Sequence, residues 1–373
     1  MHICQIIWNI DAIGGAERMV VNIAAGLQEQ GKSDITVLSI LGKSDSYYSQ
    51  KLKEMGIPLL HLFPDAQKAY NPKITTKLYK ILKLISPDVV HTHLWGASLH
   101  GYICAKLLKI PIVVHEHNVL FNRKWYWDFF DRVTFRSRSR TIACSLPVYL
   151  SLVETLKLNS KQKKTLVIIN NCINEKEFAV SKDRLSVRKE LGLAENDFVF
   201  INVASLTEQK GHRYLIEAFS LVVKEYHNAK LLIAGDGILK NDITMHIEKH
   251  KLSSNVILLG IRKDVADLLN ASDIFILPSL WEGLPMVLLE AMYRKLPAIV
   301  SNVGIMKTLV TDHVNGLLAD PMDTAKLHEH MKFFITNTLE KIKMGCEAEK
   351  IVTKSFLINV YIDSLTGIYR QIL

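Results

Sequence analysis

Two glutamates, Glu282 and Glu290, are separated by seven residues in the segment SDIFILPSLWEGLPMVLLEAM, which spans residues 272–292. The apolar run before Pro278 predicts a buried strand, and Pro285 is suited to the first turn of a helix. Glu282 would then lie in the loop at the carboxyl end of the strand. Glu290 would lie early in the helix, whose free N–H groups and dipole favour a phosphate. Because a carboxylate accepts hydrogen bonds through two oxygens, the pair suits the vicinal hydroxyls of a sugar and is compatible with a nucleotide-sugar ligand.

Neither glutamate is diagnostic alone, because two solvated carboxylates near a helix N-terminus would stabilise its dipole by a few tenths of a kcal/mol. Four histidines, His91, His93, His115 and His117, alternate along two predicted strands. Each could be a buried histidine with satisfied hydrogen bonds, and together they could form a metal site. Glu116 would point to the opposite face of its strand, and no cysteine stands at ligand spacing. A zinc site is therefore not expected.

The N-terminal half repeats a short β-branched apolar run, a turn and a segment of helical periodicity. This pattern is typical of parallel strands covered by helices. The predicted strands are 3–8, 35–41, 57–62, 89–93, 110–115, 141–144 and 166–169. The first predicted helix follows a turn at Gly14 and Gly15, and Gly31 stands where a left-handed residue would end it. Its apolar face consists of Met19, Val20, Ile23, Ala24 and Leu27.

Polar sequence after residue 169 interrupts this pattern, which starts again at Phe198, so we place a domain boundary between them. The second half has predicted strands at 198–204, 230–234, 256–259, 274–277 and 298–301. Helices are expected after Lys210, Asn241, Lys263 and Pro285. Two doubly wound, Rossmann-like α/β domains would leave a cleft at the carboxyl ends of their strands, where such sheets bind ligands. The expected domains are 1–174 and 175–354, with a last helix at 355–373 that could pack on either domain.

Length and composition agree with two folded domains. The chain has 373 residues, of which 49% are hydrophobic and 22% are charged, and these values exclude disordered and fibrous proteins. No run approaches the roughly 18 apolar residues of a membrane-spanning helix, and the start lacks the features of a signal peptide, so we expect a cytoplasmic protein. Five scattered cysteines without a CxxC spacing predict reduced thiols.

Basic charge is concentrated in residues 121–164, which contain ten Lys or Arg against three acidic residues. The aromatic residues of this segment include Phe121, Trp125, Tyr126, Trp127, Phe129, Phe130 and Phe135. The segment could meet an anionic membrane or a lipid-diphosphate acceptor, since aromatic and basic side chains favour that interface. It could equally be an amphipathic helix with a solvated face. Nucleic-acid binding is not expected, because no nucleic-acid-binding module is visible.

The two glutamates after a DIFILPS-type strand resemble the EX7E motif of retaining GT-B glycosyltransferases of family 4, the group that builds bacterial surface polysaccharides. The resemblance runs over almost the whole chain. It is carried by GGAERMVVNIAAGL, PDVVHTHL, IPIVVHEHN, INNCINEKEF, VASLTEQKGHRYLIEAF, LLIAGDG and LLGIRKDVADLLNASDIFILPS. The order and spacing of these segments are specific, although no single one is decisive. The resemblance implies a GT-B fold.

The resemblance also implies roles for individual residues. Glu290 would hold the nucleotide ribose, and Glu282 would contact hydroxyls of the donor sugar. Lys210 would hold the diphosphate, and His117 would face the donor sugar near its reacting carbon. The other implied donor-binding positions are Gly14, Gly15, Gly260, Arg262, Gly283, Leu284, Met286 and Val287.

The chain departs from the family pattern at Ser205, where an arginine usually precedes the phosphate lysine. The diphosphate would lose one cation there, and Arg213 or Arg262 could compensate. No metal cofactor is implied, because fixed cations and helix-terminal N–H groups would meet the charge of the leaving diphosphate. The sequence also contains no Asp-x-Asp triplet, the metal-binding device of the other major glycosyltransferase fold.

The resemblance therefore predicts transfer of a hexose or N-acetylhexosamine, with retention, from a nucleoside diphosphate sugar, most readily a UDP-sugar. The acceptor would be a glycan or a lipid-linked glycan of a capsule, O-antigen or exopolysaccharide, reached from the inner face of the membrane. Two alternatives stay open. A GT-B sugar-nucleotide epimerase would convert the donor without an acceptor, and a non-catalytic partner would bind the donor without releasing diphosphate.

Overall fold

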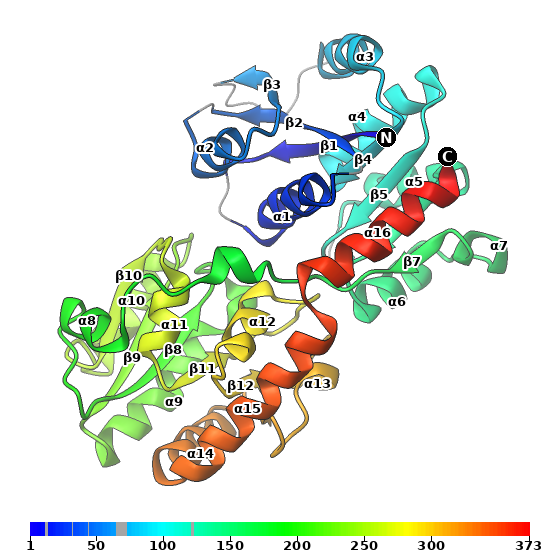
Figure 1. The fold of residues 1–373 in the computed structure, drawn as a ribbon. Coiled ribbons are helices and arrows are strands. Elements are labelled where there is room, and N and C mark those ends of the chain that lie inside the picture. The colour runs from blue at the N-terminus through cyan, green and yellow to red at the C-terminus, as the bar shows by residue number, and fades with distance from the viewer. Residues whose placement is uncertain (12–13, 32, 44, 65–72, 121–122) are drawn as a thin grey trace. The chain divides into compact units, whose positions relative to one another are not determined.

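The computed structural model describes residues 1–11, 14–31, 33–43, 45–64, 73–120 and 123–373. These residues form two compact units (Figure 1). The N-terminal unit contains Met1–Cys172 and Ile358–Leu373, and the C-terminal unit contains Ile173–Leu357. Each unit is built around its own parallel sheet, so the expected α/β architecture of two doubly wound domains is confirmed.

The described part of the N-terminal unit has a seven-stranded parallel sheet in the order β3-β2-β1-β4-β5-β6-β7. Its strands are β1 (His2–Asn9), β2 (Asp34–Gly42), β3 (Leu59–Pro64), β4 (Val89–His93), β5 (Ile112–Glu116), β6 (Arg140–Ala143) and β7 (Leu166–Ile168). Its helices are α1 (Gly15–Glu29), α2 (Tyr47–Glu54), α3 (Lys73–Ile85), α4 (Trp95–Leu108), α5 (Trp125–Thr134), α6 (Leu146–Thr155), α7 (Ser160–Lys163) and α16 (Ile358–Ile372). All seven predicted strands lie within two residues of the observed ones.

The last helix, α16, packs beside α1 in the N-terminal unit (Figure 1). Gly26 of α1 makes this close approach feasible, because a Cβ there would lie 2.6 Å from Ile362 and 3.2 Å from Ile358. The Gln30 amide also donates a 2.8 Å hydrogen bond to Asp363. The C-terminal segment, which the sequence left open between two domains, thus completes the core of the first unit.

The described part of the C-terminal unit has a six-stranded parallel sheet in the order β10-β9-β8-β11-β12-β13. Its strands are β8 (Phe198–Val203), β9 (Ala229–Ala234), β10 (Val256–Gly260), β11 (Ile274–Leu277), β12 (Ala298–Ser301) and β13 (Gly316–Ala319). Its helices are α8 (Arg184–Glu190), α9 (His212–Glu225), α10 (Lys240–Lys249), α11 (Val265–Ala271), α12 (Met286–Tyr293), α13 (Met306–Leu309), α14 (Thr324–Thr336) and α15 (Thr338–Ser355). The sequence analysis missed β13 and four helices, α8, α13, α14 and α15.

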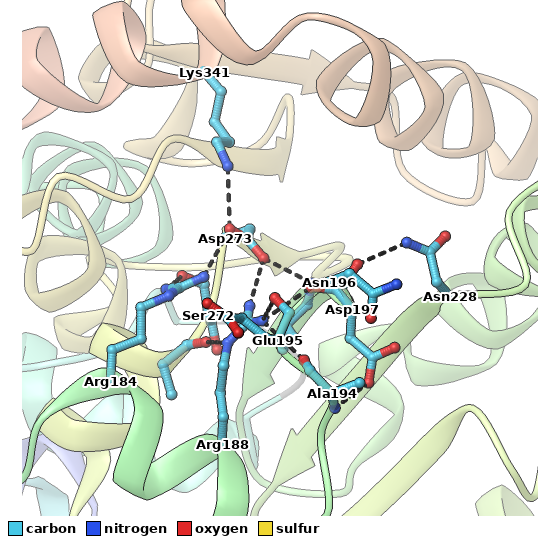
Figure 2. A network of polar contacts seen from close by, with 12 residues as sticks. Arg184, Arg188, Ala194, Glu195, Asn196, Asp197, Asn228, Ser272, Asp273 and Lys341 are labelled. Atoms are coloured by element: carbon cyan, nitrogen blue, oxygen red, sulfur yellow. Dashed lines mark hydrogen bonds and ion pairs between the residues drawn. The ribbon is translucent and has the colours of Figure 1, made fainter.

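Helix α8 is held mainly by polar contacts, which explains why apolar periodicity did not predict it. Asp273, directly before β11, accepts hydrogen bonds from Arg184 at 2.9 Å, Arg188 at 2.9 Å and Lys341 at 3.1 Å (Figure 2). The backbone N–H of Val199 donates to the same carboxylate at 2.9 Å. One partly buried carboxylate therefore joins α8, α15 and the start of β8, and its charge is matched by cations.

Candidate functional site

The loops that follow β8, β11 and β12 in the C-terminal unit are packed backbone against backbone at the carboxyl edge of the sheet. Gly211 has φ +66°, and a Cβ there would lie 2.1 Å from the carbonyl oxygen of Pro278. Gly304 has φ +56°, and its Cβ would lie 2.2 Å from the carbonyl oxygen of Glu282. Only glycine meets both requirements, because it tolerates the left-handed region and carries no side chain. These contacts fix the loops that carry the predicted site residues.

Lys210 and Glu282 form a largely buried ion pair at this edge. Lys210 ends the 3₁₀ turn η3 (Glu208–Lys210), and its Nζ donates to Glu282 Oε1. The Ser279 hydroxyl donates to the same oxygen at 2.8 Å. The Gln209 side chain donates to the carbonyl of Trp281 at 2.8 Å, which ties the two loops together again. The structure thus brings together two residues that are 72 positions apart in the sequence.

The segment after Glu282 enters α12, as the position of Pro285 predicted. Pro285 is the N-cap residue, and Met286 is the first residue of the helix. The other predicted donor-binding residues of this segment differ in burial: Gly283, Leu284, Met286 and Glu290 are buried, and Val287 is half-buried. The Glu290 side chain is 1% exposed. The backbone N–H groups in the first turn of α12 have no partner within the helix and point out of its N-terminal end, which follows the Glu282 loop.

The remaining residues predicted for the C-terminal unit are placed as follows. Gly260 ends β10 with φ +64°, and among the described residues no heavy atom lies within 4 Å of a Cβ built there. Arg262 donates to Asp264 at 2.8 Å and 2.5 Å, and Arg213 donates to Glu217 at 3.1 Å on the exposed surface of α9. Both guanidinium groups suggested as replacements for the family arginine therefore already contact a carboxylate. Ser205 is exposed after β8.

In the N-terminal unit, Gly14 is the N-cap of α1 and Gly15 is its first residue. A Cβ on Gly14 would lie 2.5 Å from Glu17 Oε2, so this carboxylate fills the turn. Burial raises the pKa of Glu17 above its ordinary value. Sequence analysis did not single out Glu17, although its position three residues after Gly14 was a signal that it faces the same turn.

His117 follows β5 and belongs to a group of four histidines on the sheet. Its Nε2 lies 3.1 Å from Nδ1 of His93, and its ring stacks on His115 with centroids 4.1 Å apart. Burial lowers the pKa of His117 to about 3, so its imidazole is neutral at neutral pH. One nitrogen from each of His91, His93 and His115 lies within 4.8 Å of the other two. These three side chains are therefore close enough together to hold a metal ion, which the sequence analysis did not expect.

Within the basic aromatic segment, residues 125–134 form α5, and the two faces of this helix differ. Asp131 is buried and pairs with Arg123 and Arg138 at 2.5 Å each, so two of the ten cations are structural. Burial and the charge of Asp131 raise the pKa of Glu116, which lies near this group, to about 7. The opposite face exposes apolar side chains at helical spacing, namely Trp125, Tyr126, Phe129 and Val133. Phe121 lies outside the described residues. None of the helices in the described ranges is long and apolar enough to cross a membrane.

Residues 183–351 match the family model described as Glycosyl transferases group 1, and residues 13–177 match the model described as Glycosyltransferase Family 4. The chain is 33% identical over 271 residues to the Escherichia coli UDP-Gal:alpha-D-GlcNAc-diphosphoundecaprenol alpha-1,3-galactosyltransferase, in an alignment that covers 67% of each chain. It is 27% identical over 310 residues to the Bacillus anthracis N-acetyl-alpha-D-glucosaminyl L-malate synthase, covering 82% of this chain and 80% of that one.

Solved structures show the same fold at low sequence identity. Anabaena HepE in complex with UDP and glucose matches with a TM-score of 0.86 at 20% identity, over 99% of each chain. WaaG, a glycosyltransferase involved in lipopolysaccharide biosynthesis, matches with a TM-score of 0.79 at 18% identity, over 98% of this chain and 99% of that one. The two family models together span most of the sequence. The chain therefore belongs to glycosyltransferase family 4 and is a glycosyltransferase with the GT-B fold.

Proposed function

We propose that this glycosyltransferase moves a hexose or N-acetylhexosamine from a UDP-sugar to a lipid-diphosphate-linked glycan, with retention of anomeric configuration, in surface polysaccharide synthesis. The observation that carries the proposal is the buried Lys210–Glu282 pair at the loop edge of the C-terminal sheet. The choice of UDP is supported by HepE, whose complexes contain UDP and UDP-glucose. The choice of acceptor is supported by the Escherichia coli relative, whose name specifies a diphosphoundecaprenol-linked sugar.

The pair offers a cation for the diphosphate of a nucleotide sugar and a hydrogen-bond acceptor for its sugar hydroxyls. A diphosphate would draw the Lys210 ammonium away from Glu282 Oε1, because phosphate oxygens offer more charge than one carboxylate. The Glu282 carboxylate would keep its hydrogen bond from Ser279 and gain capacity to accept from sugar hydroxyls. Binding thus exchanges one ion pair for two sets of polar contacts. No metal is needed at the diphosphate in this scheme.

The transfer itself breaks the bond between the anomeric carbon and the UDP oxygen and forms a bond from the acceptor oxygen on the same face. The proton of the acceptor hydroxyl goes to the departing phosphate oxygen, and UDP leaves. Lys210 and the first-turn N–H groups of α12 stabilise the charge that develops on the diphosphate. Glu282 and the neutral His117 orient the sugar. The ribose hydroxyls are assigned to Glu290.

A lipid-linked acceptor requires the enzyme to work at a membrane surface, and α5 offers a face of suitable chemistry. Trp125 is 77% exposed and Phe129 is 61% exposed, and the exposed cations Lys124, Arg132 and Arg136 flank them. Aromatic side chains favour the headgroup region, and each nearby cation contributes about 1 kcal/mol on an anionic surface. We assign this face to peripheral contact with the inner side of the cell membrane.

The decisive experiment incubates the purified protein with UDP- and GDP-sugars and a diphosphoundecaprenol-linked acceptor, and measures UDP or GDP release together with sugar transfer. We expect release and transfer with one UDP-sugar, and loss of both when acceptor is omitted. Conversion of donor without acceptor would instead establish the epimerase. Tight binding of an intact donor would establish a non-catalytic partner.

Two variants make the assignment specific. Lys210→Ala is expected to weaken UDP binding by about 10-fold to 100-fold, because a charge-assisted hydrogen bond to phosphate is lost. Lys224→Ala, an exposed lysine of α9, is the matched control and should leave affinity unchanged. Unaltered UDP affinity in Lys210→Ala would remove Lys210 from the site.

Membrane contact is tested separately by sedimentation with anionic and neutral vesicles. Trp125→Ser combined with Phe129→Ser should lower partitioning onto anionic vesicles. Leu84→Ser, which changes an exposed apolar residue of α3, should not. If the α5 double variant and Leu84→Ser bound anionic vesicles equally well, α5 would not be the membrane contact. The proposal of sugar transfer would not be affected by that result.

A further inference from the structure

Four histidines lie on one face of two adjacent strands in the N-terminal unit. Strands β4 and β5 are parallel, and their register places His93 beside His115. Because side chains alternate along a strand, His91 lies on the same face as His93, and His117 lies on the same face as His115. His91, His93 and His115 are completely buried, and one nitrogen of each lies within 4.8 Å of the others.

The hydrogen bonds of this cluster leave several buried nitrogens unmatched. His91 Nδ1 contacts the Tyr369 hydroxyl at 2.6 Å, and His93 Nε2 contacts Gln5 Oε1 at 3.0 Å. His91 Nε2 and both ring nitrogens of His115 have no hydrogen-bond partner among the residues that the structure describes. A buried polar group without a partner costs about 1–3 kcal/mol. The cluster is therefore poorly explained as a group of satisfied core histidines.

The contacts that do exist are those of metal-binding histidines. A histidine that binds a metal through one nitrogen usually donates its other N–H to an oxygen, which fixes the tautomer and the ring orientation. Gln5 Oε1 can only accept, so it fixes the proton of His93 on Nε2 and leaves Nδ1 with a lone pair. The Tyr369 hydroxyl can accept from His91 Nδ1, which leaves Nε2 with a lone pair. One nitrogen on each of these two rings is thus left with a lone pair that could bind a metal.

We propose that His91, His93 and His115 bind a zinc ion that fastens α16 to the β4–β5 face of the N-terminal unit. Zinc is bound by imidazole nitrogens at about 2.0–2.1 Å, so a tetrahedral site needs the three nitrogens about 3.3 Å apart. The three nitrogens now lie within 4.8 Å of one another, so the rings would have to turn to bring them to this spacing. Helix α16 is part of the site because it supplies Tyr369, and Tyr361 of the same helix stacks on His115 with centroids 6.5 Å apart.

The proposed site is chemically distinct from the transfer reaction. It would hold the metal through three neutral nitrogens without a carboxylate, and it neither contacts the diphosphate nor supplies a step of the transfer. One connection exists, because His93 Nδ1 now faces His117 Nε2 at 3.1 Å. Binding of zinc to His93 Nδ1 would break this contact and leave Nε2 of His117 free for another partner.

The test uses the full chain, stripped of metal with a chelator and then supplied with zinc or cobalt. We expect about one zinc per chain by elemental analysis, a rise in Tm on zinc addition, and the visible absorption of tetrahedral cobalt. His115→Gln should lower zinc affinity at least about 100-fold and abolish the cobalt absorption, since one of three ligands is lost. His100→Gln, a partly buried histidine of α4 outside the cluster, is the matched control and should bind zinc as the wild type does.

Two results would overturn the proposal. One is a wild-type chain that takes up no zinc and shows neither a Tm rise nor the cobalt absorption. The other is zinc bound equally by the wild type, His115→Gln and His91→Gln, which would place the ion elsewhere. If His115→Gln fails to fold, Gln5→Leu replaces it as the variant. That change keeps all three ligands, removes the outer partner of His93 together with the 3.3 Å hydrogen bond from Gln5 to the Val20 carbonyl, and should weaken zinc binding about 10-fold to 100-fold.

Discussion

Each unit of this glycosyltransferase buries a group of polar side chains at its parallel sheet, and the two groups are satisfied to different degrees. In the C-terminal unit, Asp273 accepts from three cationic side chains and one backbone N–H (Figure 2). In the N-terminal unit, the histidine cluster keeps buried nitrogens without a hydrogen-bond partner within the described residues. A complete network serves packing, whereas an incomplete one indicates a place for a ligand.

The Lys210–Glu282 pair lies between these two extremes. It is neutralised internally, but under the proposed function each of its members would bind a second partner when substrate arrives. The network around Asp273 has no such freedom, because its cations come from two helices that it holds in place. The difference between a structural and a functional buried charge therefore lies in whether the partners can be exchanged. Four predictions test this distinction.

The largest effect is expected for Asp273→Asn, which removes the negative charge and leaves three cations uncompensated. Removing one partner of a buried pair costs about 3–5 kcal/mol, and because these pairs are partly exposed to solvent we expect the C-terminal unit to lose about 3 kcal/mol of unfolding free energy. Urea denaturation with amide hydrogen exchange over Ile173–Leu357 measures the loss. Asp242→Asn, at an exposed position of α10, is the control. If both variants were equally stable, the Asp273 network would not hold the unit together.

Glu282→Gln should lower activity, and its effect on stability is measured separately. We expect sugar transfer to fall about 100-fold, equivalent to about 2.7 kcal/mol, because the carboxylate that accepts from the sugar becomes a weaker, half-donating amide. The Ser279 hydroxyl can still donate to Oε1, but Lys210 loses its charged partner, so we also expect the unfolding free energy to fall by about 1–3 kcal/mol, which urea denaturation measures separately. Glu248→Gln on α10 serves as the control. Transfer at the wild-type rate would refute the role of Glu282.

Gly304→Ala tests whether Glu282 depends on its supporting loop. The new Cβ would press on the carbonyl oxygen of Glu282, in addition to the strain of φ +56°, so we expect a loss of about 2 kcal/mol together with weaker donor binding. Gly192→Ala has a similar φ of +69° and no neighbour in the described structure within 4 Å of its Cβ. Gly192→Ala should lose only about 1 kcal/mol of unfolding free energy, from backbone strain, and should keep wild-type donor affinity. Equal behaviour of the two variants would show that the contact with Glu282 is unimportant.

A pH-dependent effect concerns His212, a buried histidine of the C-terminal unit that lies apart from the histidine cluster. Burial and the nearby Lys210 charge lower the pKa of His212 to about 4. Above pH 6.5 the side chain is neutral in both folded and unfolded chains. As the pH falls toward 4, only the unfolded chain gains the proton, so stability decreases by at most about 1.4 kcal/mol per pH unit. Compared with His212→Gln, the wild type should lose this additional stability between pH 6 and pH 4 in urea titrations, and parallel profiles would contradict the assignment.

Much of the fold could be predicted because its signals are local. Apolar runs located β4, β11 and β12 to the residue, and Pro285 located the start of α12. Helix α8 was missed because it is anchored through Arg184 and Arg188 rather than through an apolar stripe. The four-residue strand β13 was missed because GLLA is too short to show a period.

The sequence by itself determined two parallel α/β domains, the family, and the candidate positions of Lys210 and Glu282 in loops at strand ends. Only the tertiary structure decided that these two side chains pair, because they come from strands that are adjacent in space and 72 residues apart in the chain. The tertiary structure also decided which nitrogens of the histidine cluster have hydrogen-bond partners. Alternation along a strand shows which face a side chain takes, but hydrogen-bond partners such as Tyr369, 278 residues from His91, are set by packing between distant segments.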